Sequence, residues 1–157
     1  MTSTTRNEAS VADDEAFTVT RSISIAAPAE KVWRAITEPE HLSFWFGRTV
    51  LDGAGVGTMT FDGHGAVPIR VEAIDPPRSV SYRWSNDNAL DRLPVELDEE
   101  NSTVFRFTLA PEGEGTRLTV VESGFEKTSD PLANLDSHRR GWDAELDKLI
   151  ALFGGAA

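Results

Sequence analysis

Hydrophobic and polar residues alternate along several short stretches of the chain, and a period of two is typical of half-buried β-strands. In the first stretch, 17–25, the alternating apolar positions include Val19, Ile23 and Ile25, and Arg21 falls on the same parity. Further strands are predicted at 48–51, 58–61, 67–74, 80–84, 103–109 and 116–122. Because the connections between these strands are too short for helical crossovers, we expect an antiparallel sheet.

The spacing of hydrophobic residues changes to three and four in other stretches, as in amphipathic helices. Two short helices are predicted after the first strand, the first starting at Pro28 and the second ending at Gly47. A long helix is predicted between the N-cap residue Asp130 and Gly154. Its apolar stripe holds Leu132, Leu135, Trp142, Leu146, Leu149, Ile150 and Phe153. This order of elements predicts the α+β class, with helices on one face of the sheet.

Composition and charge narrow the class of protein. The chain has 157 residues, a formal net charge of −11 and no cysteine. This length fits one domain, and the excess of acids argues against a nucleic-acid partner, which needs a basic surface. Because the sequence has neither a run of about 18 apolar residues nor an apolar leader, we expect no membrane insertion and a cytoplasmic location. Residues 1–16 are polar, so we expect a disordered tail before a domain at 17–154.

The histidines do not follow a metal-binding pattern. His41, His64 and His138 are far apart in the sequence, and the chain has no cysteine that could complete a site with them. Since structural and catalytic metal sites draw most of their ligands from closely spaced histidines and cysteines, we expect neither a metal site nor a cofactor.

Four segments of the chain resemble one known superfamily. They are 25–46 (IAAPAEKVWRAITEPEHLSFWF), 70–84 (RVEAIDPPRSVSYRW), 109–125 (LAPEGEGTRLTVVESGF) and 141–152 (GWDAELDKLIAL). In this order they are similar to the START-like, or SRPBCC, helix-grip superfamily, in the branch named after the C-terminal domain of the activator of heat-shock protein 90 ATPase. The resemblance implies a curved antiparallel sheet of about six to seven strands wrapped around the long C-terminal helix. Two short helices would follow the first strand.

The resemblance also implies an apolar cavity between the sheet and the long helix. Small-molecule sites are mostly apolar, with a few polar groups that orient the ligand. The alternative is that the same aromatic rings fill a closed core, and the sequence leaves both readings open. The candidate ligand-binding residues are Trp45, Phe46, Met59, Phe61, Val71, Tyr82, Trp84, Phe105, Phe107, Leu135, His138, Arg139, Trp142 and Leu146.

A few polar residues could give such a cavity its selectivity. Arg139 shares the apolar stripe of the long helix and could anchor an anionic ligand, but a packed stem with the head at the rim or paired with Asp143 is favoured. His138 flanks the stripe, and a position on the helix surface is favoured over a ligand contact. Glu122 shares the inward parity of its strand, with a place at the rim favoured. Arg21 could face the cavity or pair with an acid. No catalytic motif is formed, so no catalytic residue is assigned.

A long polar segment at 85–102 interrupts the series of strands and is rich in acidic residues. Loops of this length are uncommon in compact domains and are often lids or mobile segments. We expect a solvated loop here, with a lid over the mouth of the cavity as the alternative.

Three functions fit these features. The leading hypothesis is non-catalytic binding of a small hydrophobic ligand (aromatic, polyketide-like or lipid-like) in the cavity. The resemblance also implies an enzyme such as a polyketide cyclase or hydrolase, which would need an acid–base group among Glu122, His138, Arg139 and Tyr82. A third alternative is a co-chaperone that acts on a heat-shock protein 90 type ATPase. A homodimer is left open in each case.

Overall fold

The computed structural model describes residues 7–154, which form one eight-stranded antiparallel sheet, three α-helices and a short 3-10 helix. The strands are β1 (Val11–Asp13), β2 (Thr18–Ile25), β3 (Arg48–Leu51), β4 (Val56–Phe61), β5 (Gly65–Asp75), β6 (Ser79–Trp84), β7 (Thr103–Glu112) and β8 (Gly115–Ser123). The helices are α1 (Ala29–Thr37), α2 (Pro39–Trp45), η1 (Phe125–Lys127) and α3 (Pro131–Leu152). The strand order β1-β2-β8-β7-β6-β5-β4-β3 and the long final helix confirm the expected α+β helix-grip fold.

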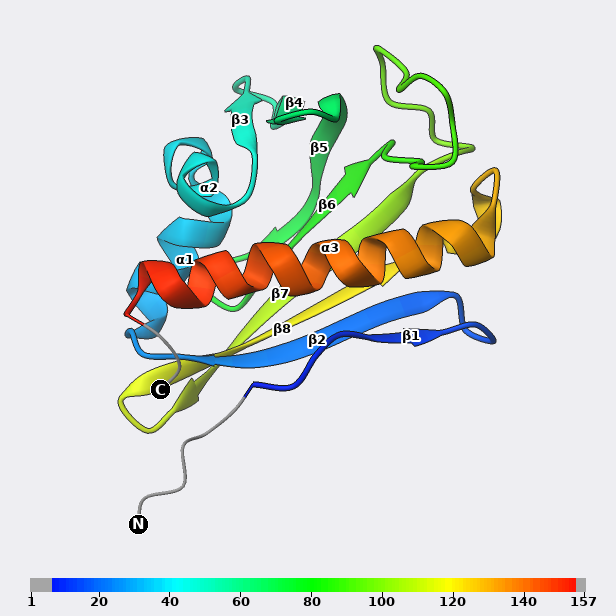
Figure 1. Cartoon of the computed structure of the whole chain (residues 1–157). Coiled ribbons are helices and arrows are strands. Elements are labelled where there is room, and N and C mark those ends of the chain that lie inside the picture. Colours follow the sequence, from blue (N-terminus) through cyan, green and yellow to red (C-terminus); the bar gives the residue numbers. More distant parts are fainter. Residues whose placement is uncertain (1–6, 155–157) are drawn as a thin grey trace.

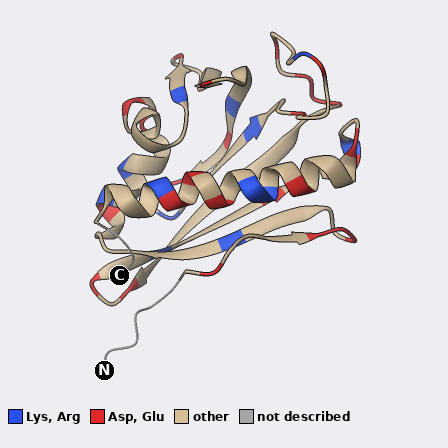
Figure 2. Ribbon diagram, in the orientation of Figure 1, with Lys and Arg blue, Asp and Glu red and all other residues tan. Residues whose placement is uncertain are grey.

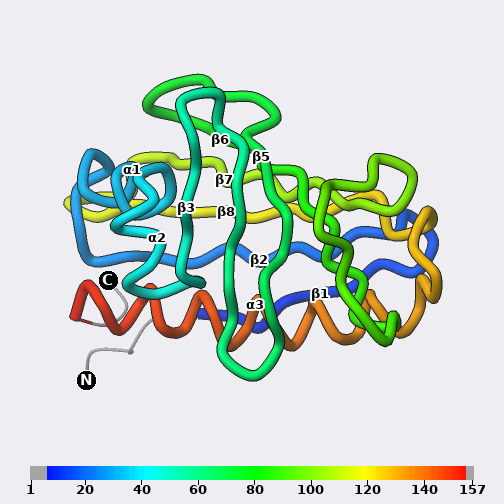
Figure 3. Tube along the Cα trace, turned by 90° about the horizontal axis from the view of Figure 1, so that it is seen from above, coloured from blue at the N-terminus to red at the C-terminus, as the bar shows by residue number. Residues whose placement is uncertain are grey.

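Helix α3 crosses the concave face of the curved sheet, and α1 and α2 cover one end of it (Figure 1). The carboxylate of the N-cap residue Asp130 accepts a hydrogen bond from the Ala133 N–H, as its position predicted. The turn between β4 and β5 reaches over α3, as the view from above shows (Figure 3). The buried face of α3 consists of Asn134, Leu135, His138, Trp142, Leu146 and Leu149. The buried face of α3 therefore combines apolar residues with two polar ones, His138, which contacts Glu122 of β8, and Asn134, which contacts Asp87.

The N-terminal segment differs from the expected disordered tail. Strand β1 pairs with β2 along the edge of the sheet. Just before it, Ser10 donates hydrogen bonds from its N–H and its Oγ to Asp143 of α3, at 2.7 and 2.8 Å. The prediction is therefore wrong at β1, because backbone pairing and a side-chain anchor order a segment that has no apolar pattern. Residues 1–6, the start of the predicted tail, lie outside the described residues.

Of the two alternatives predicted for Arg21, a place facing the cavity or a pair with an acid, the structure shows the second. Its side chain is buried between β2 and α3, and Nη2 lies 2.8 Å from Oδ1 of Asp147. Nε donates to the carbonyl of Glu8 and Nη1 to the carbonyl of Asp143. The guanidinium thus joins the N-terminal segment, the sheet and α3, and it takes no part in the cavity described below.

The acidic segment 85–102 is fixed at its start, although its middle is exposed (Figure 2). The buried carboxylate of Asp87 accepts hydrogen bonds from Asn134 Nδ2 and from the Ser129 N–H, each at 2.8 Å. Burial by itself would raise the pKa of Asp87, but these donors and Asn101 lower it well below its usual range. The expectation of a solvated loop is therefore wrong at Asp87, which ties the start of the segment to α3.

Candidate functional site

A cavity of about 320 Å³ lies between α3, the β4–β5 turn and the start of the acidic segment. It is lined by Phe46, Phe61, His64, Trp84, Asn86, Asn88, Ser137, His138, Gly141, Trp142 and Glu145. Its outer residues, such as His64, Asn88 and Gly141, are exposed, whereas Trp84 and Trp142 at its inner end are buried. This volume is at the lower end of ligand pockets, which span about 300–1,000 Å³.

Aromatic rings form the inner wall of the cavity. The ring of Phe46, which follows α2, lies 5.3 Å from that of Trp142 on α3 and 5.7 Å from that of Trp84 on β6, between ring centroids. Phe61, at the end of β4, lies 5.6 Å from Phe46. These separations are those of favourable aromatic pairs, so the rings support one another and keep the wall in place.

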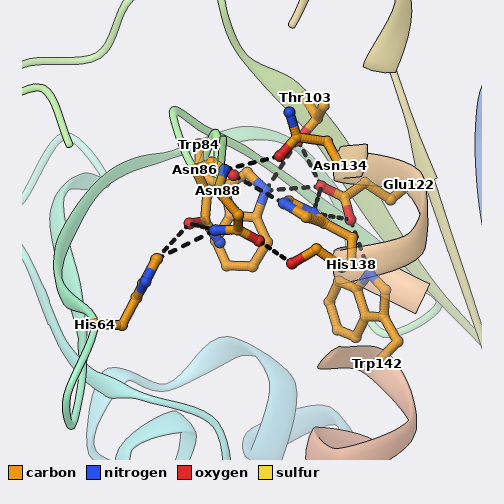
Figure 4. Close-up of polar contacts among 10 residues, drawn as sticks. His64, Trp84, Asn86, Asn88, Thr103, Glu122, Asn134, His138 and Trp142 are labelled. Atoms are coloured by element: carbon orange, nitrogen blue, oxygen red, sulfur yellow. Dashed lines mark hydrogen bonds and ion pairs between the residues drawn. The ribbon is translucent and has the colours of Figure 1, made fainter. Parts of the chain in front are cut away.

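A carboxylate is buried directly behind this wall. Glu122 on β8 is fully buried, and its oxygens accept hydrogen bonds from the indole N–H groups of Trp84 and Trp142, each at 2.8 Å (Figure 4). The hydroxyl of Thr103 donates to the same group, and His138 Nδ1 lies 2.9 Å from both oxygens. Four donors therefore surround one carboxylate, which stabilises its charged form despite burial.

His138 makes contacts with both of its ring nitrogens. Nδ1 faces the Glu122 carboxylate, and Nε2 lies 2.8 Å from the backbone carbonyl of Asn86. A carbonyl can only accept, so Nε2 carries a proton, and a charged carboxylate requires a second proton on Nδ1. Burial by itself would lower the pKa of His138, but the charge of Glu122 and these hydrogen bonds raise it above its usual value. The ring is therefore an imidazolium paired with Glu122.

Burial acts in the opposite direction on the partner carboxylate. It would by itself raise the pKa of Glu122, but the charge of His138 and the surrounding donors lower it below its usual value. The two groups thus form a buried ion pair with no net charge. Such a pair is strongly coupled, so removing one member leaves an uncompensated charge in the interior.

Polar side chains cross the mouth of the cavity (Figure 4). His64, in the β4–β5 turn, places Nε2 2.9 Å from Oδ1 of Asn86. Asn88 donates from Nδ2 to the same oxygen at 3.0 Å, and its own Oδ1 accepts from Ser137 Oγ of α3 at 2.7 Å. These contacts link the turn, the acidic segment and α3. The start of the acidic segment is therefore one wall of the cavity.

The structure divides the candidate ligand-binding residues other than Arg139 into two groups. Those that line the cavity are Phe46, Phe61, Trp84, His138 and Trp142. Those that are packed in or against the core instead are Trp45, Met59, Val71, Tyr82, Phe105, Phe107, Leu135 and Leu146. Two of the latter point their polar atoms at α1: Trp45 Nε1 donates to the Ala35 carbonyl, and Tyr82 Oη donates to that of Ile36.

Three polar residues lie elsewhere than expected. Arg139 is not among the residues that line the cavity, and it pairs with Asp136, at 2.7 Å, rather than with Asp143. This placement makes Arg139 unavailable as an anchor inside the cavity. His138 is buried rather than on the helix surface, and Glu122 is in the interior rather than at the rim. Each of these two keeps its charge in the interior because the other supplies the opposite charge.

Some cavity residues were not among the candidates. Ser137, Gly141 and Glu145 lie four residues apart on α3, next to His138 and Trp142, so helical spacing would have indicated them. His64, Asn86 and Asn88 come from irregular segments and gave no signal in the sequence. No group of residues arranged to hold a metal ion occurs within 7–154.

Comparison with known families gives the classification. The family described as Activator of Hsp90 ATPase homolog 1-like protein matches residues 26–154. The chain belongs to this family. The match includes the whole cavity lining, so the resemblance of the four sequence segments is confirmed.

Solved structures agree with this assignment. Protein MLL2253 from Mesorhizobium loti is 28% identical with a TM-score of 0.68, covering 86% of this chain and 95% of that one. CalU16 from Micromonospora echinospora is 22% identical with a TM-score of 0.64, covering 87% and 76%. The Aha1 dimer from Colwellia psychrerythraea is 21% identical with a TM-score of 0.64, covering 87% and 95%. The last two show a shared fold.

The remaining comparisons add two facts. Among curated proteins, none matches the chain. None of the helices within the described residues is long and apolar enough to cross a membrane. Membership of the family therefore establishes the fold, and the function has to be argued from the cavity itself.

Proposed function

We propose that this chain binds a small, largely aromatic or apolar ligand in the cavity beside α3 and does not act on it chemically. Support comes from the aromatic inner wall and from the polar groups at the mouth, an arrangement typical of small-molecule sites. Burial of apolar ligand surface contributes about 25 cal/mol per Å². The rings would supply affinity, and the mouth would orient the ligand.

Gly141 is the observation that carries the proposal. It lies in the middle of α3 and lines the cavity, and a Cβ atom placed on it would meet no heavy atom within 4 Å. Glycine inside a helix costs about 1 kcal/mol relative to alanine. Packing against the described residues does not require this glycine. Because it has no side chain, it leaves space at the mouth of the cavity. A ligand that enters this space would explain why glycine occupies the position.

Catalysis is less well supported by the same site. His138 has both nitrogens engaged, and Glu122 is enclosed behind the aromatic wall, so neither offers a free proton site to a ligand. Burial raises the pKa of Tyr82, whose hydroxyl donates to a backbone carbonyl. Arg139 lies outside the cavity. The four residues that the sequence offered for general acid–base chemistry are thus already occupied or lie outside the cavity.

The partner alternatives rest on the family alone. The family description names an Hsp90 ATPase activator, and one similar structure is an Aha1 dimer. A chaperone partner and a homodimer stay predictions for this chain. Both can be tested apart from ligand binding, by ATPase stimulation and by the concentration dependence of the molecular mass.

A side chain that fills the cavity tests the proposal directly. We would measure binding of naphthylmethanol by isothermal titration calorimetry to the wild type, Gly141→Ala, Gly141→Phe and Ala144→Phe. Ala144 is exposed on the same helix and does not line the cavity, so it is the matched control. We expect binding to the wild type, to Gly141→Ala and to the control, and at least about a tenfold loss in Gly141→Phe. No binding to the wild type, or equal binding to Gly141→Phe, would contradict the proposal.

A further inference from the structure

Acidic and basic side chains in the lining of the cavity do not balance each other. Its titratable residues are His64, His138 and Glu145. The charge of His138 is compensated by Glu122 behind it, and His64 lies at the exposed mouth. The lining contains no lysine or arginine. Glu145 is therefore the acidic side chain of the lining, and its ion-pair partner Lys148 lies outside the lining.

The carboxylate of Glu145 is short of partners. Its side chain is 19% exposed, and its Oε2 is buried without a hydrogen-bond donor among the described residues. Its ion-pair partner is Lys148, whose Nζ lies 2.6 Å from that oxygen and whose side chain is 54% exposed. Water around the exposed lysine weakens the attraction between the two charges, so Lys148 offsets the charge of Glu145 only in part. Burial accordingly raises the pKa of Glu145.

Aromatic faces surround the same space. Trp142 precedes Glu145 by three residues on α3, so the two side chains lie on one side of the helix. Phe46, Phe61 and Trp84 complete the wall. The faces of aromatic rings carry negative partial charge and attract cations, most strongly for tryptophan and when the cation is desolvated. A carboxylate beside several rings is the combination that suits an ammonium group.

We infer that the cavity selects ligands that carry an ammonium group, with the positive charge between Glu145 and the aromatic wall, and disfavours carboxylates such as fatty acids. This inference rests on the proposed function and names the chemical class of its ligand. An amine N–H would donate to the carboxylate of Glu145 and compete there with the ammonium group of Lys148. A carboxylate ligand would meet the charge of Glu145, while the lining cation His138 is already paired with Glu122.

Three probes with the same ring system separate charge from shape. We would measure calorimetric affinities of naphthylmethylamine, naphthylmethanol and naphthoate at about pH 8, where alkyl amines are protonated. The wild type should bind the amine about tenfold more tightly than the alcohol, and the naphthoate most weakly. In Glu145→Gln the preference for the amine over the alcohol should disappear, while the affinity for the alcohol stays within about twofold. Glu114→Gln, which changes an exposed charge in the β7–β8 turn, is the matched control and should keep the preference.

Lys148→Gln is a second test, in which the expected change in amine affinity is opposite to that in Glu145→Gln. Because it removes the competing cation of Glu145, it should strengthen binding of the amine and leave the alcohol unchanged. If the alcohol binds and Gly141→Phe blocks it, but the amine has no advantage or the naphthoate binds best, the inference is wrong and the proposed function stands. If the preference persists in Glu145→Gln, the assignment of Glu145 is wrong. If no probe binds the wild type, the proposed function fails together with the inference.

Discussion

His138 Nδ1 lies 2.9 Å from both carboxylate oxygens of Glu122, and this contact joins α3 to β8 in the interior of the protein. The other nitrogen of His138 holds the carbonyl of Asn86, which belongs to a wall of the cavity. The two indole donors to Glu122 also belong to cavity residues, Trp84 and Trp142. A single buried ion pair therefore fixes three sides of the candidate site.

Removing the negative member of the pair should be strongly destabilising. In Glu122→Gln the imidazolium of His138 loses its counter-charge, and the amide cannot accept from all of the surrounding donors. Breaking a buried pair in this way typically costs about 3–5 kcal/mol. Urea denaturation would measure the change in the free energy of unfolding. Glu126→Gln, at an exposed position in η1, should change it by less than about 0.5 kcal/mol. A loss below about 1 kcal/mol in Glu122→Gln would show that the pair is not charged.

The same pair predicts how stability depends on pH. The pKa of His138 is raised above its usual 6.5, so its contribution is full below that pH and is lost as the pH rises through the higher folded-state value. The pKa of Glu122 is lowered below its usual 4.5, so its contribution is full above that pH and is lost as the pH falls through the folded-state value. The contribution of the pair to the free energy of unfolding should therefore be largest between about pH 4.5 and 6.5.

Urea denaturation across this range would show the maximum, and His138→Gln should flatten the part of the profile above about pH 6.5. The difference between the two profiles reports the pair as a whole, because the pKa of Glu122 also depends on the charge of His138. Identical profiles for the two proteins would mean that His138 does not titrate differently on folding.

Gly141→Ala should stabilise the protein. The added methyl group points into open space, and alanine is favoured over glycine within a helix by about 1 kcal/mol. Thermal unfolding should show a higher Tm, and Ala144→Gly on the same helix should show a lower one. A lower Tm for Gly141→Ala would indicate that the space beside Gly141 is filled, which contradicts an open cavity.

Asp87→Asn should loosen a wall of the cavity. Asp87 accepts from Asn134 and Ser129 and lies between Asn86 and Asn88, which line the cavity. Loss of the charge weakens these bonds and should cost about 1–3 kcal/mol. Hydrogen exchange at the start of the acidic segment should become faster, whereas Asp91→Asn, at an exposed position of the same segment, should leave exchange unchanged. Unaltered exchange in Asp87→Asn would show that other contacts hold the wall.

The fold could be predicted because its signals are local. Strands such as 17–25 alternate in polarity, and α3 begins at a residue suited to cap it. Strand β1 could not be found in this way, because its order depends on pairing with β2 and on the contact of Ser10 with Asp143, which lies 133 residues further along. A short polar strand has no periodic pattern of its own.

The candidate site depended more on distant contacts. The parity of Glu122 predicted an inward side chain, but a buried carboxylate is costly unless donors surround it. Those donors come from β6, β7 and α3, at 16–38 residues from Glu122 in the sequence, and no sequence motif indicates them. For Arg139 the favoured alternative, a head at the rim or paired with Asp143, named the wrong acid, because Asp143 accepts from Ser10 and Asp136 pairs with the arginine.

Native mass spectrometry of the protein purified from its own host tests the central claim most directly. The account predicts that the wild type carries a small-molecule adduct, that Ala144→Phe keeps it, and that Gly141→Phe lacks it because the added ring occupies the cavity. A bare protein mass for the wild type, or the same adduct on Gly141→Phe, would contradict binding in this cavity.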